Sequence, residues 1–240
     1  MQDIPPLNLV VGFLPAILVV AIFFRWGLGG TSAIVALARM VIQLLVVGYL
    51  LVFIFDTSQP WIVLGVITFM MSVASWIALA PIADQRRQLL GYALASIAIG
   101  GLTTLALVTQ CVLSLEPRWQ PRVVIPLAGM IFANCMNCVS LAGERFVSET
   151  RDGKSYEDAR AIAMRAAMIP ITNALLSVGL VSLPGMMTGQ ILQGTSPLVA
   201  VRYQIMVMSM VFGAGGISAA GFLWCLRPKF SNTGIKHEND

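Results

Sequence analysis

Residues 178–205 have the sequence VGLVSLPGMMTGQILQGTSPLVAVRYQI, and this stretch decides which fold the chain can adopt. Up to Val201 it belongs to a run, residues 166–201, that contains no charged residue, and it is interrupted by Pro184, Gly185, Gly189, Gly194 and Pro197. A lipid-facing helix has no need of such breaks, because each proline forfeits a backbone hydrogen bond that lipid cannot replace. Two interpretations are open. Either an interrupted helix packs inside a membrane bundle beside a transport route, or a plain span ends at Pro184 and an external loop follows.

The composition indicates a membrane protein. The chain has 240 residues, of which 58% are hydrophobic and only 11% are charged, whereas about a quarter of the residues in a soluble domain are charged. The mean hydropathy of +0.84 agrees. The basic residues form no clustered face, so we expect a polytopic membrane protein that binds no nucleic acid.

The apolar runs predict an all-α bundle of about seven membrane-spanning helices, since a span needs about 20 apolar residues. We expect them at about residues 7–24, 36–55, 61–80, 90–113, 123–142, 166–192 and 203–226, with the sixth interrupted at Pro184 and Gly185. The whole chain, 1–240, is then one membrane domain. Its polar parts are a segment at about 143–165 and a short tail at 227–240.

The basic residues predict the orientation. With the N-terminus outside, only Arg118, Arg122 and Arg202 fall on the outer side. The inner connections then hold twelve basic residues, Arg25, Arg39, Arg86, Arg87, Arg145, Arg151, Lys154, Arg160, Arg165, Arg227, Lys229 and Lys236. This bias favours an outer N-terminus and a cytoplasmic C-terminus. It also favours a single crossing by the run 166–201, because a second crossing would weaken the bias.

The sequence offers no arrangement for conventional catalysis. The single histidine, His237, lies in the C-terminal tail, and no HExxH or GxxxxGK[ST] motif is present. We therefore expect neither enzymatic activity nor a bound cofactor, and any energy from ATP must come from a partner.

One face of the fifth expected span is polar. Met130, Asn134, Asn137, Cys138 and Leu141 share this face at helical spacing, and Cys135 lies beside it. One interpretation is a soft-metal site built from the two thiols and the Met130 thioether. The other is a stripe that faces the bundle, with interhelical hydrogen bonds from the asparagines and with the thiols as packing groups. The second needs no further ligand, whereas CxxC on one helix cannot complete a metal shell.

Two other polar features complete the sequence pattern. Arg39 and Gln43 share a helix face, with Arg39 expected as an anchor near the inner end of the second span and Gln43 deeper in the bundle. The segment 143–165 alternates in charge, which predicts a solvated helix pair with a turn at Asp152 and Gly153. Such a pair is also a candidate lever for a soluble partner.

Three blocks of the sequence resemble the permease subunits of the FetB family. They are ARMVIQLLVVGYLLVFIF at 38–55, VVIPLAGMIFAN at 123–134 and the opening stretch at 178–205. Members of that family are small membrane subunits of ABC transporters, assigned to metal (iron) export in bacteria, with plant relatives tied to aluminium tolerance. The matching motif residues are Arg39, Gly129, Leu183, Pro184, Gly185, Met186, Met187, Gly189, Tyr203 and Gln204.

The resemblance implies a permease subunit in the inner membrane, with two copies pairing with two ABC ATPase subunits that bind the ATP. It implies that segment 143–165 couples to the ATPase, and we place the coupling contacts at Asp158, Arg160 and Arg165. The chain departs from the family pattern in lacking a clear EAA…LGA stretch. It also has Thr172 and Asn173 where an acidic residue is expected, and the resemblance gives no support to a metal site at the two cysteines.

For a metal-ion cargo, we expect a path of neutral groups that passes the ion without trapping it. Its candidate residues are Gln43, Met130, Asn134, Asn137 and Thr188. The alternative function is a non-transporting membrane scaffold or assembly factor.

Overall fold

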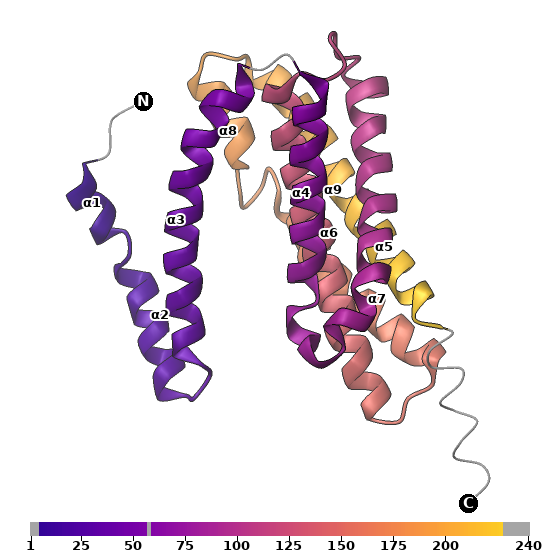
Figure 1. The fold of residues 1–240 in the computed structure, drawn as a ribbon. Coiled ribbons are helices and arrows are strands. Elements are labelled where there is room, and N and C mark those ends of the chain that lie inside the picture. The colour runs from indigo at the N-terminus through magenta and orange to yellow at the C-terminus, as the bar shows by residue number, and fades with distance from the viewer. Residues whose placement is uncertain (1–4, 57–58, 228–240) are drawn as a thin grey trace, which may run out of the picture. The chain divides into compact units, whose positions relative to one another are not determined.

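The computed structural model describes residues 5–56 and 59–227, and these form helices joined by short connections (Figure 1). Within them the extended backbone pairs only at an isolated bridge between Val178 and Ser182. The chain divides into two compact units, Met1–Thr57 and Ser58–Asp240, which are described separately as unit 1 and unit 2. The predicted C-terminal tail lies outside the described residues, apart from Arg227.

Unit 1 is an apolar helical hairpin. Its helices are α1 (Pro6–Val11), α2 (Leu14–Arg25) and α3 (Gly30–Phe55). A Cβ atom on Gly30 would lie only 2.5 Å from a ring carbon of Phe24, so glycine permits the close approach of α3 to the end of α2. No described residue of α2 is buried, and α3 buries only Gly30 and Ile54 within the chain. The hairpin therefore offers apolar surface suited to lipid or to protein.

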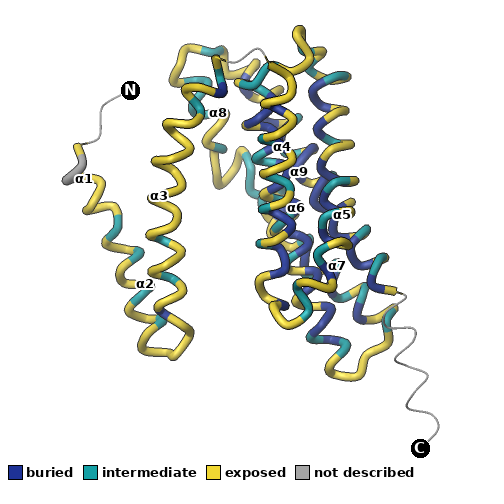
Figure 2. The backbone as a smooth tube through the Cα atoms, viewed as in Figure 1, coloured by how far each residue is buried: buried dark blue, intermediate teal, exposed yellow. Residues whose placement is uncertain are grey.

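Unit 2 is a bundle built around one long central helix. Its elements are α4 (Pro60–Ala78), the 3₁₀ turn η1 (Ala80–Gln85), α5 (Arg86–Ala106), the π-helical turn η2 (Leu107–Val112), α6 (Pro121–Arg151), α7 (Tyr156–Ser177), α8 (Gly185–Leu192) and α9 (Pro197–Cys225). The long helices α4, α5, α6, α7 and α9 alternate in direction, and α8 continues the direction of α7 (Figure 1). Helix α6 contacts α4, α5, α7 and α9. Buried residues concentrate on α6, α9 and one side of α5 (Figure 2).

Small residues set the spacing of these helices. A Cβ atom on Gly100 of α5 would lie 2.9 Å from the backbone oxygen of Ala214 and 2.9 Å from the backbone nitrogen of Ser218, both on α9. A Cβ atom on Gly215 of α9 would lie 2.8 Å from the Cys138 sulfur on α6. Without a hydrophobic drive between helices in lipid, such close backbone approach provides the packing that holds them together.

The expected helical membrane bundle is confirmed, but the number of continuous spans is six and not seven. Within the described residues, six helices are long and apolar enough to cross a membrane. They are residues Asn8–Arg25, Gly30–Phe55, Pro60–Ala78, Ala80–Val112, Pro121–Arg151 and Pro197–Cys225. The predicted sixth span, 166–192, is not among these helices. Its first part, α7, begins early, at Tyr156, and ends at Ser177, and its second part, α8, has only 8 residues.

The predicted interruption exists, but it begins earlier in the chain. Val178 already has extended backbone, and Gly179 follows with a φ of +82°, which an L side chain rarely adopts, so the helix ends at Ser177. Pro184 then has extended backbone and precedes the first residue of α8, where its missing N–H costs nothing. Together α7 and α8 run once from one end of unit 2 to the other (Figure 1), as expected of a single crossing in two pieces.

The close contact at Gly100 predicts a stability difference within α5. Gly100→Ala should lower the thermal stability of the purified protein, because its methyl group meets α9 backbone and overpacking costs about 1–3 kcal/mol. Gly91→Ala is the matched control, since nothing lies within 4 Å of that Cβ position. Thermal unfolding in detergent, followed by size-exclusion chromatography, should show a lower midpoint for the first variant only. Equal midpoints would show that the α5–α9 contact is not tight.

Candidate functional site

Several backbone groups in the break between α7 and α8 form hydrogen bonds within the break itself. The Gly179 N–H donates to the Ser182 carbonyl at 2.9 Å, and the Val181 N–H donates to the Ser177 carbonyl at 2.8 Å. The Thr188 hydroxyl donates to the Pro184 carbonyl at 3.1 Å, which closes the first turn of α8. These local hydrogen bonds provide part of what a non-helical segment needs at membrane depth.

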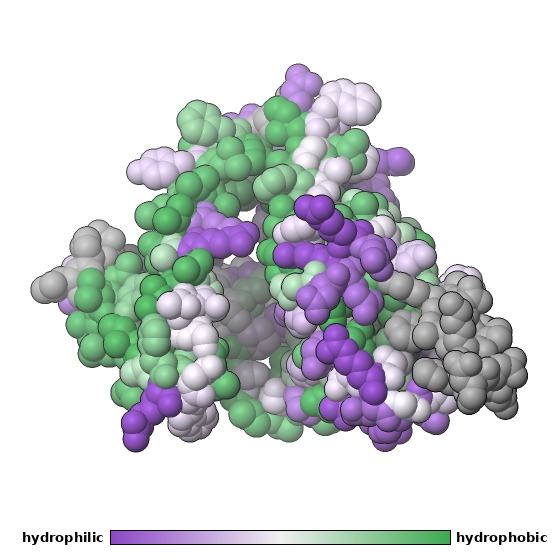
Figure 3. All heavy atoms as spheres, turned by 60° about the horizontal axis from the view of Figure 1, so that its bottom comes forward, coloured by the Kyte–Doolittle hydropathy of each residue, from purple (hydrophilic) through white to green (hydrophobic). Residues whose placement is uncertain are grey.

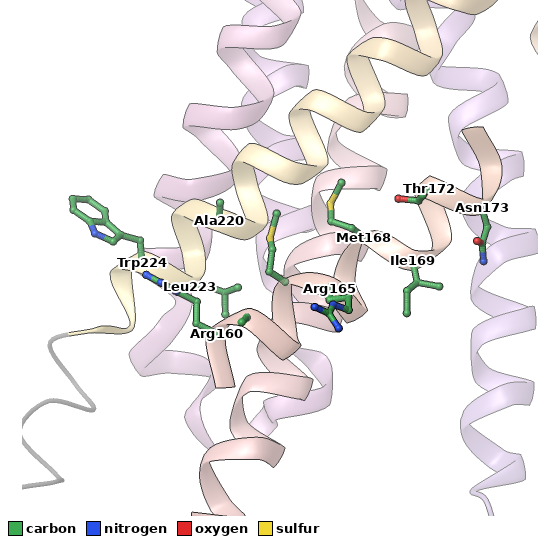
Figure 4. A pocket seen from close by; sticks show the side chains of 11 residues that line it. Arg160, Arg165, Met168, Ile169, Thr172, Asn173, Ala220, Leu223 and Trp224 are labelled. Atoms are coloured by element: carbon green, nitrogen blue, oxygen red, sulfur yellow. The ribbon is translucent and has the colours of Figure 1, made fainter. Parts of the chain in front are cut away.

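A cavity of about 820 Å³ opens between α7 and α9, and we refer to it as the α7–α9 cavity. Figure 4 shows its side chains, with Arg160 and Trp224 toward one side and Thr172 and Asn173 toward the other. Its lining comprises Arg160, Ala161, Met164, Arg165, Met168, Ile169, Thr172, Asn173, Ala220, Leu223 and Trp224. The lining therefore combines two guanidinium groups with apolar side chains and a hydroxyl and carboxamide pair.

A second cavity, of about 600 Å³, lies among α6, α8, α9 and the connection before α6, and we refer to it as the α6–α8–α9 cavity. Its lining comprises Leu113, Leu115, Gln120, Arg122, Val123, Pro126, Leu127, Met130, Met186, Gln190, Tyr203 and Met206. The Gln190 side-chain oxygen is buried and has no hydrogen-bond partner in the structure. An unpaired buried acceptor has a desolvation cost, so this oxygen is suited to receive a hydrogen bond or a cation.

A packed layer separates the two cavities along α9. Met206 lines one cavity and Ala220 lines the other, and 14 residues of helix span roughly 21 Å at 1.5 Å per residue. Between them Met210 and Ala214 of α9 are buried, and Gly215 approaches Cys138 of α6. The two cavities therefore lie at different levels of unit 2, one beside α7 and the other beside α8.

The structure brings together only part of the predicted substrate path. Met130 lines the α6–α8–α9 cavity. Asn134 is half-buried, and its Nδ2 donates to the Met130 carbonyl at 3.0 Å, whereas Asn137 is exposed. Thr188 uses its hydroxyl on its own helix, and Gln43 belongs to unit 1. Within unit 2, Asn134, Asn137 and Thr188 therefore form no closed ring of oxygens.

The two cysteines of the fifth predicted span pack in the interior of unit 2. Cys135 and Cys138 are buried, and Cys138 meets α9 at Gly215. Among the described residues, no group of three or more His, Cys, Asp or Glu side chains could hold a metal ion. The thiols therefore act as small packing groups in the α6–α9 contact, and the metal site at these two residues stays a prediction without a third ligand.

Arg39 lies deeper in its helix than the sequence suggested. The helix begins at Gly30, so Arg39 is more than two turns from its start. With the Gln43 amide in its hydrogen-bonding orientation, the Gln43 side-chain oxygen accepts from Arg39 Nε at 2.9 Å. The predicted pair on one face is confirmed, and the helix that carries it starts at Gly30, before residue 36; the position of Arg39 near the inner end of the span stays a prediction.

The predicted helix pair at 143–165 is present, with α6 reaching Arg151 and α7 starting at Tyr156. The turn at Asp152 and Gly153 is confirmed, and Gly153 has a φ of +82°. The pair is not fully solvated, because Phe146, Ala159 and Ala163 are buried. The alternating charges concealed an apolar face that packs within unit 2.

A cluster of polar contacts fixes this hairpin, which we call the α6–α7 hairpin. The buried Glu149 carboxylate receives Arg145 and Lys154, each at 2.5 Å. The Tyr156 hydroxyl donates to the Leu223 carbonyl of α9 at 2.9 Å, and its ring packs edge-on against Phe146. The start of α7 is thus tied to the ends of both α6 and α9.

The three predicted coupling residues have different surroundings. Asp158 belongs to the N-cap of α7, since its backbone N–H donates to the Ser155 hydroxyl at 3.2 Å. Arg160 forms an ion pair with Glu157 and lies 5.5 Å from the centre of the Tyr156 ring. Arg165 lines the α7–α9 cavity.

Charged side chains gather at this end of unit 2, which we call the charged end, and the hairpin forms part of it (Figure 3). A narrow groove of about 240 Å³ lies there between η1 and the last turns of α6, with Asp84 and Arg151 in its lining. Within unit 2, the connection after α4 and the α6–α7 hairpin, both assigned to the inner side from the sequence, therefore lie side by side. Arg118 lies instead on the connection before α6, and Arg122 and Arg202 lie near the starts of α6 and α9, at the opposite end.

Sequence reasoning missed how the cavities are assembled. The sequence around Gln190 and Met206 does not indicate that they line one cavity, because only the packing of α8 on α9 brings them together. The start of α7 did carry a signal. Ser155 followed by Asp158 is a helix-capping pattern that would have placed the helix start before Arg160.

These features define a multi-pass, all-helical membrane protein with one crossing broken into two pieces and a cavity beside each piece. The chain belongs to the Uncharacterised protein family (UPF0014), whose model matches residues 6–230.

Relatives from bacteria and plants cover most of the chain. A UPF0014 membrane protein of Synechocystis sp. is 37% identical over 84% of this chain and 85% of its own. The probable iron export permease protein FetB of Escherichia coli is 35% identical over 82% of this chain and 81% of its own. Protein ALUMINUM SENSITIVE 3 of Arabidopsis thaliana is 31% identical over 82% and 76%. No solved structure matches the chain significantly.

The Glu149 cluster predicts a stability effect at the charged end. Glu149→Gln should lower the thermal midpoint of the purified protein, because the buried carboxylate is replaced by a neutral group while Arg145 and Lys154 remain beside it. Glu157→Gln is the matched control, since that ion pair is exposed and contributes little. If both variants unfold at the same temperature, Glu149 does not fix the hairpin.

Proposed function

We propose that this chain is the permease subunit of an ABC transporter that exports a metal ion such as iron. ATP is bound and hydrolysed on a separate ATPase subunit, and two copies of each subunit form the complex in the inner membrane. The relative FetB of Escherichia coli, named as a probable iron export permease protein, supports the cargo and the direction. The proposal places the charged end and the α6–α7 hairpin in the cytoplasm, with the N-terminus outside.

The observation that carries the proposal is a broken crossing with a cavity beside each piece. Transport by alternating access needs a binding region that opens to one side and then to the other. The α7–α9 cavity lies toward the charged end and the α6–α8–α9 cavity lies toward the opposite end. Movement of α7 and α8 about the break would change which of them is open.

The hairpin gives a physical route from the ATPase to the cavity. Its turn is exposed at Arg151, Asp152 and Lys154, where a soluble partner can reach it. Below the turn, the Glu149 cluster and the Tyr156–Leu223 hydrogen bond hold the hairpin to α9. A force on the turn would therefore move α7, which lines the α7–α9 cavity, because the hairpin would bend little.

The first test of the proposal is co-purification with the ATPase. The chain, solubilised in mild detergent from its own membranes, should bring an ABC ATPase with it, and Arg151→Glu combined with Asp152→Lys should remove most of that ATPase. Both residues are exposed, so the fold should be retained. Arg118→Glu, exposed on a connection at the opposite end, is the control that should leave the ATPase bound.

Two other outcomes would count against the proposal. If no ATPase accompanies the folded chain, the scaffold function is favoured. If the ATPase is retained by the hairpin variant but lost with the Arg118 variant, the orientation is wrong.

The two asparagines predicted on the substrate path give a second test. Asn134→Leu combined with Asn137→Leu should reduce metal export at least tenfold in cells that depend on this transporter, because the cargo would pass an apolar layer without carboxamides. Ala133→Leu, at an exposed position on the same helix, is the control and should export normally. Unchanged export by the double variant would remove these asparagines from the path. Retained co-purification with the ATPase would show that both variants assemble.

A further inference from the structure

We propose that the α7–α9 cavity receives a small organic anion that bears carboxylate or phosphate groups, so that a metal enters it as an anionic chelate and not as a bare cation. The inference rests on the proposed function, because it names the form in which the cargo of that permease is bound.

The charge of the lining is the first argument. Arg160 and Arg165 line the cavity, and no aspartate or glutamate does. A bare di- or trivalent metal ion that leaves water needs oxygen ligands, chiefly carboxylates, and is repelled by guanidinium groups. An oxyanion is attracted by the same guanidinium groups, because they bind carboxylate and phosphate through paired charge-assisted hydrogen bonds.

Arg165 is the residue best placed to bind the anion. No carboxylate among the described residues forms an ion pair with it, and its side chain lies among the cavity residues in Figure 4. Arg160 forms its ion pair with Glu157 and so supplies a partly neutralised second charge. We therefore expect Arg165 to contribute more binding free energy than Arg160.

The size and the remaining lining fit an organic molecule. The volume of about 820 Å³ lies in the range of small-molecule sites, 300–1,000 Å³, and far exceeds the space that one ion fills. Thr172 and Asn173 offer a hydroxyl and a carboxamide for polar groups away from Arg160. Met168 and Ile169 provide apolar contact for a carbon skeleton.

The lining of the other cavity likewise contains no acidic side chain. Arg122 is in the lining of the α6–α8–α9 cavity, and again no acidic residue is. A cargo that passes from one cavity to the other would therefore meet no carboxylate in either. This agrees with an anionic chelate, whose own oxygens satisfy the metal throughout the crossing.

Equilibrium dialysis of the purified chain in detergent tests the inference without any ATPase. The probes are labelled citrate, the gallium(III)–citrate complex, inorganic phosphate and iron(II) alone under anaerobic conditions. We expect at least one oxyanion probe to bind and iron(II) alone not to bind. Arg165→Gln should weaken that binding at least tenfold and Arg160→Gln should weaken it less, whereas Arg87→Gln, exposed at the charged end, should not change it.

Thermal midpoints equal to the parent would establish that the variants are folded. Comparing citrate with phosphate identifies which oxyanion the cavity prefers.

The inference is overturned if iron(II) alone binds and Arg165→Gln leaves that binding unchanged, or if no oxyanion binds to the folded chain. An anionic lipid is the remaining competitor, and the dialysis is therefore repeated in nanodiscs of phosphatidylcholine with and without phosphatidylglycerol. Loss of citrate and phosphate binding in the phosphatidylglycerol discs would identify a lipid site and overturn the inference.

Failure of this inference and failure of the proposed function give different results. Oxyanion binding without a co-purifying ATPase would contradict the proposed transporter function but support the proposed ligand class. An associated ATPase together with a cavity that binds only bare cations would support the transporter function and contradict the anionic ligand.

Discussion

The need to satisfy every backbone amide at membrane depth is the constraint on which unit 2 depends. A continuous helix pairs its backbone amides within itself, whereas residues 178–184 are not helical and lose that pairing. The segment recovers part of the loss through the hydrogen bonds of Gly179 and Val181 within the turn. Its other polar groups need protein or water around them.

The break is usable only because the rest of unit 2 is rigid. Gly100 and Gly215 let α5 and α6 approach α9 so closely that side chains cannot slide between them. Packed helices of this kind move as bodies, and the weakest point in the bundle is then the segment without helical hydrogen bonds. The Tyr156–Leu223 hydrogen bond ties the start of α7 to α9, so a movement of α7 would be largest at its other end, where the break lies.

Much of the fold could be predicted from the sequence, because the length of an apolar run is a strong signal in a chain with so little charge. The end of α6 could not, since the charges after Ala142 concealed a buried face that includes Phe146. The break was placed too late because prolines are conspicuous, whereas the positive φ of Gly179 is a property of the folded backbone. The cavity of Arg165 and Trp224 joins residues far apart in the chain, and no local pattern encodes that pairing.

The distribution of charge connects these observations to the proposed transport. The chain holds no charge from residue 166 to 201, so α8 and the break can lie in the bundle without a desolvated ion. The arginines of α7 come immediately before that run, where the α7–α9 cavity receives them. A permease built in this way would attract its cargo at the mouth through fixed positive charge, and the run 166–201 would offer that cargo only neutral groups. Selectivity would then depend on the charge of the whole cargo molecule more than on the ligands of a dedicated metal site.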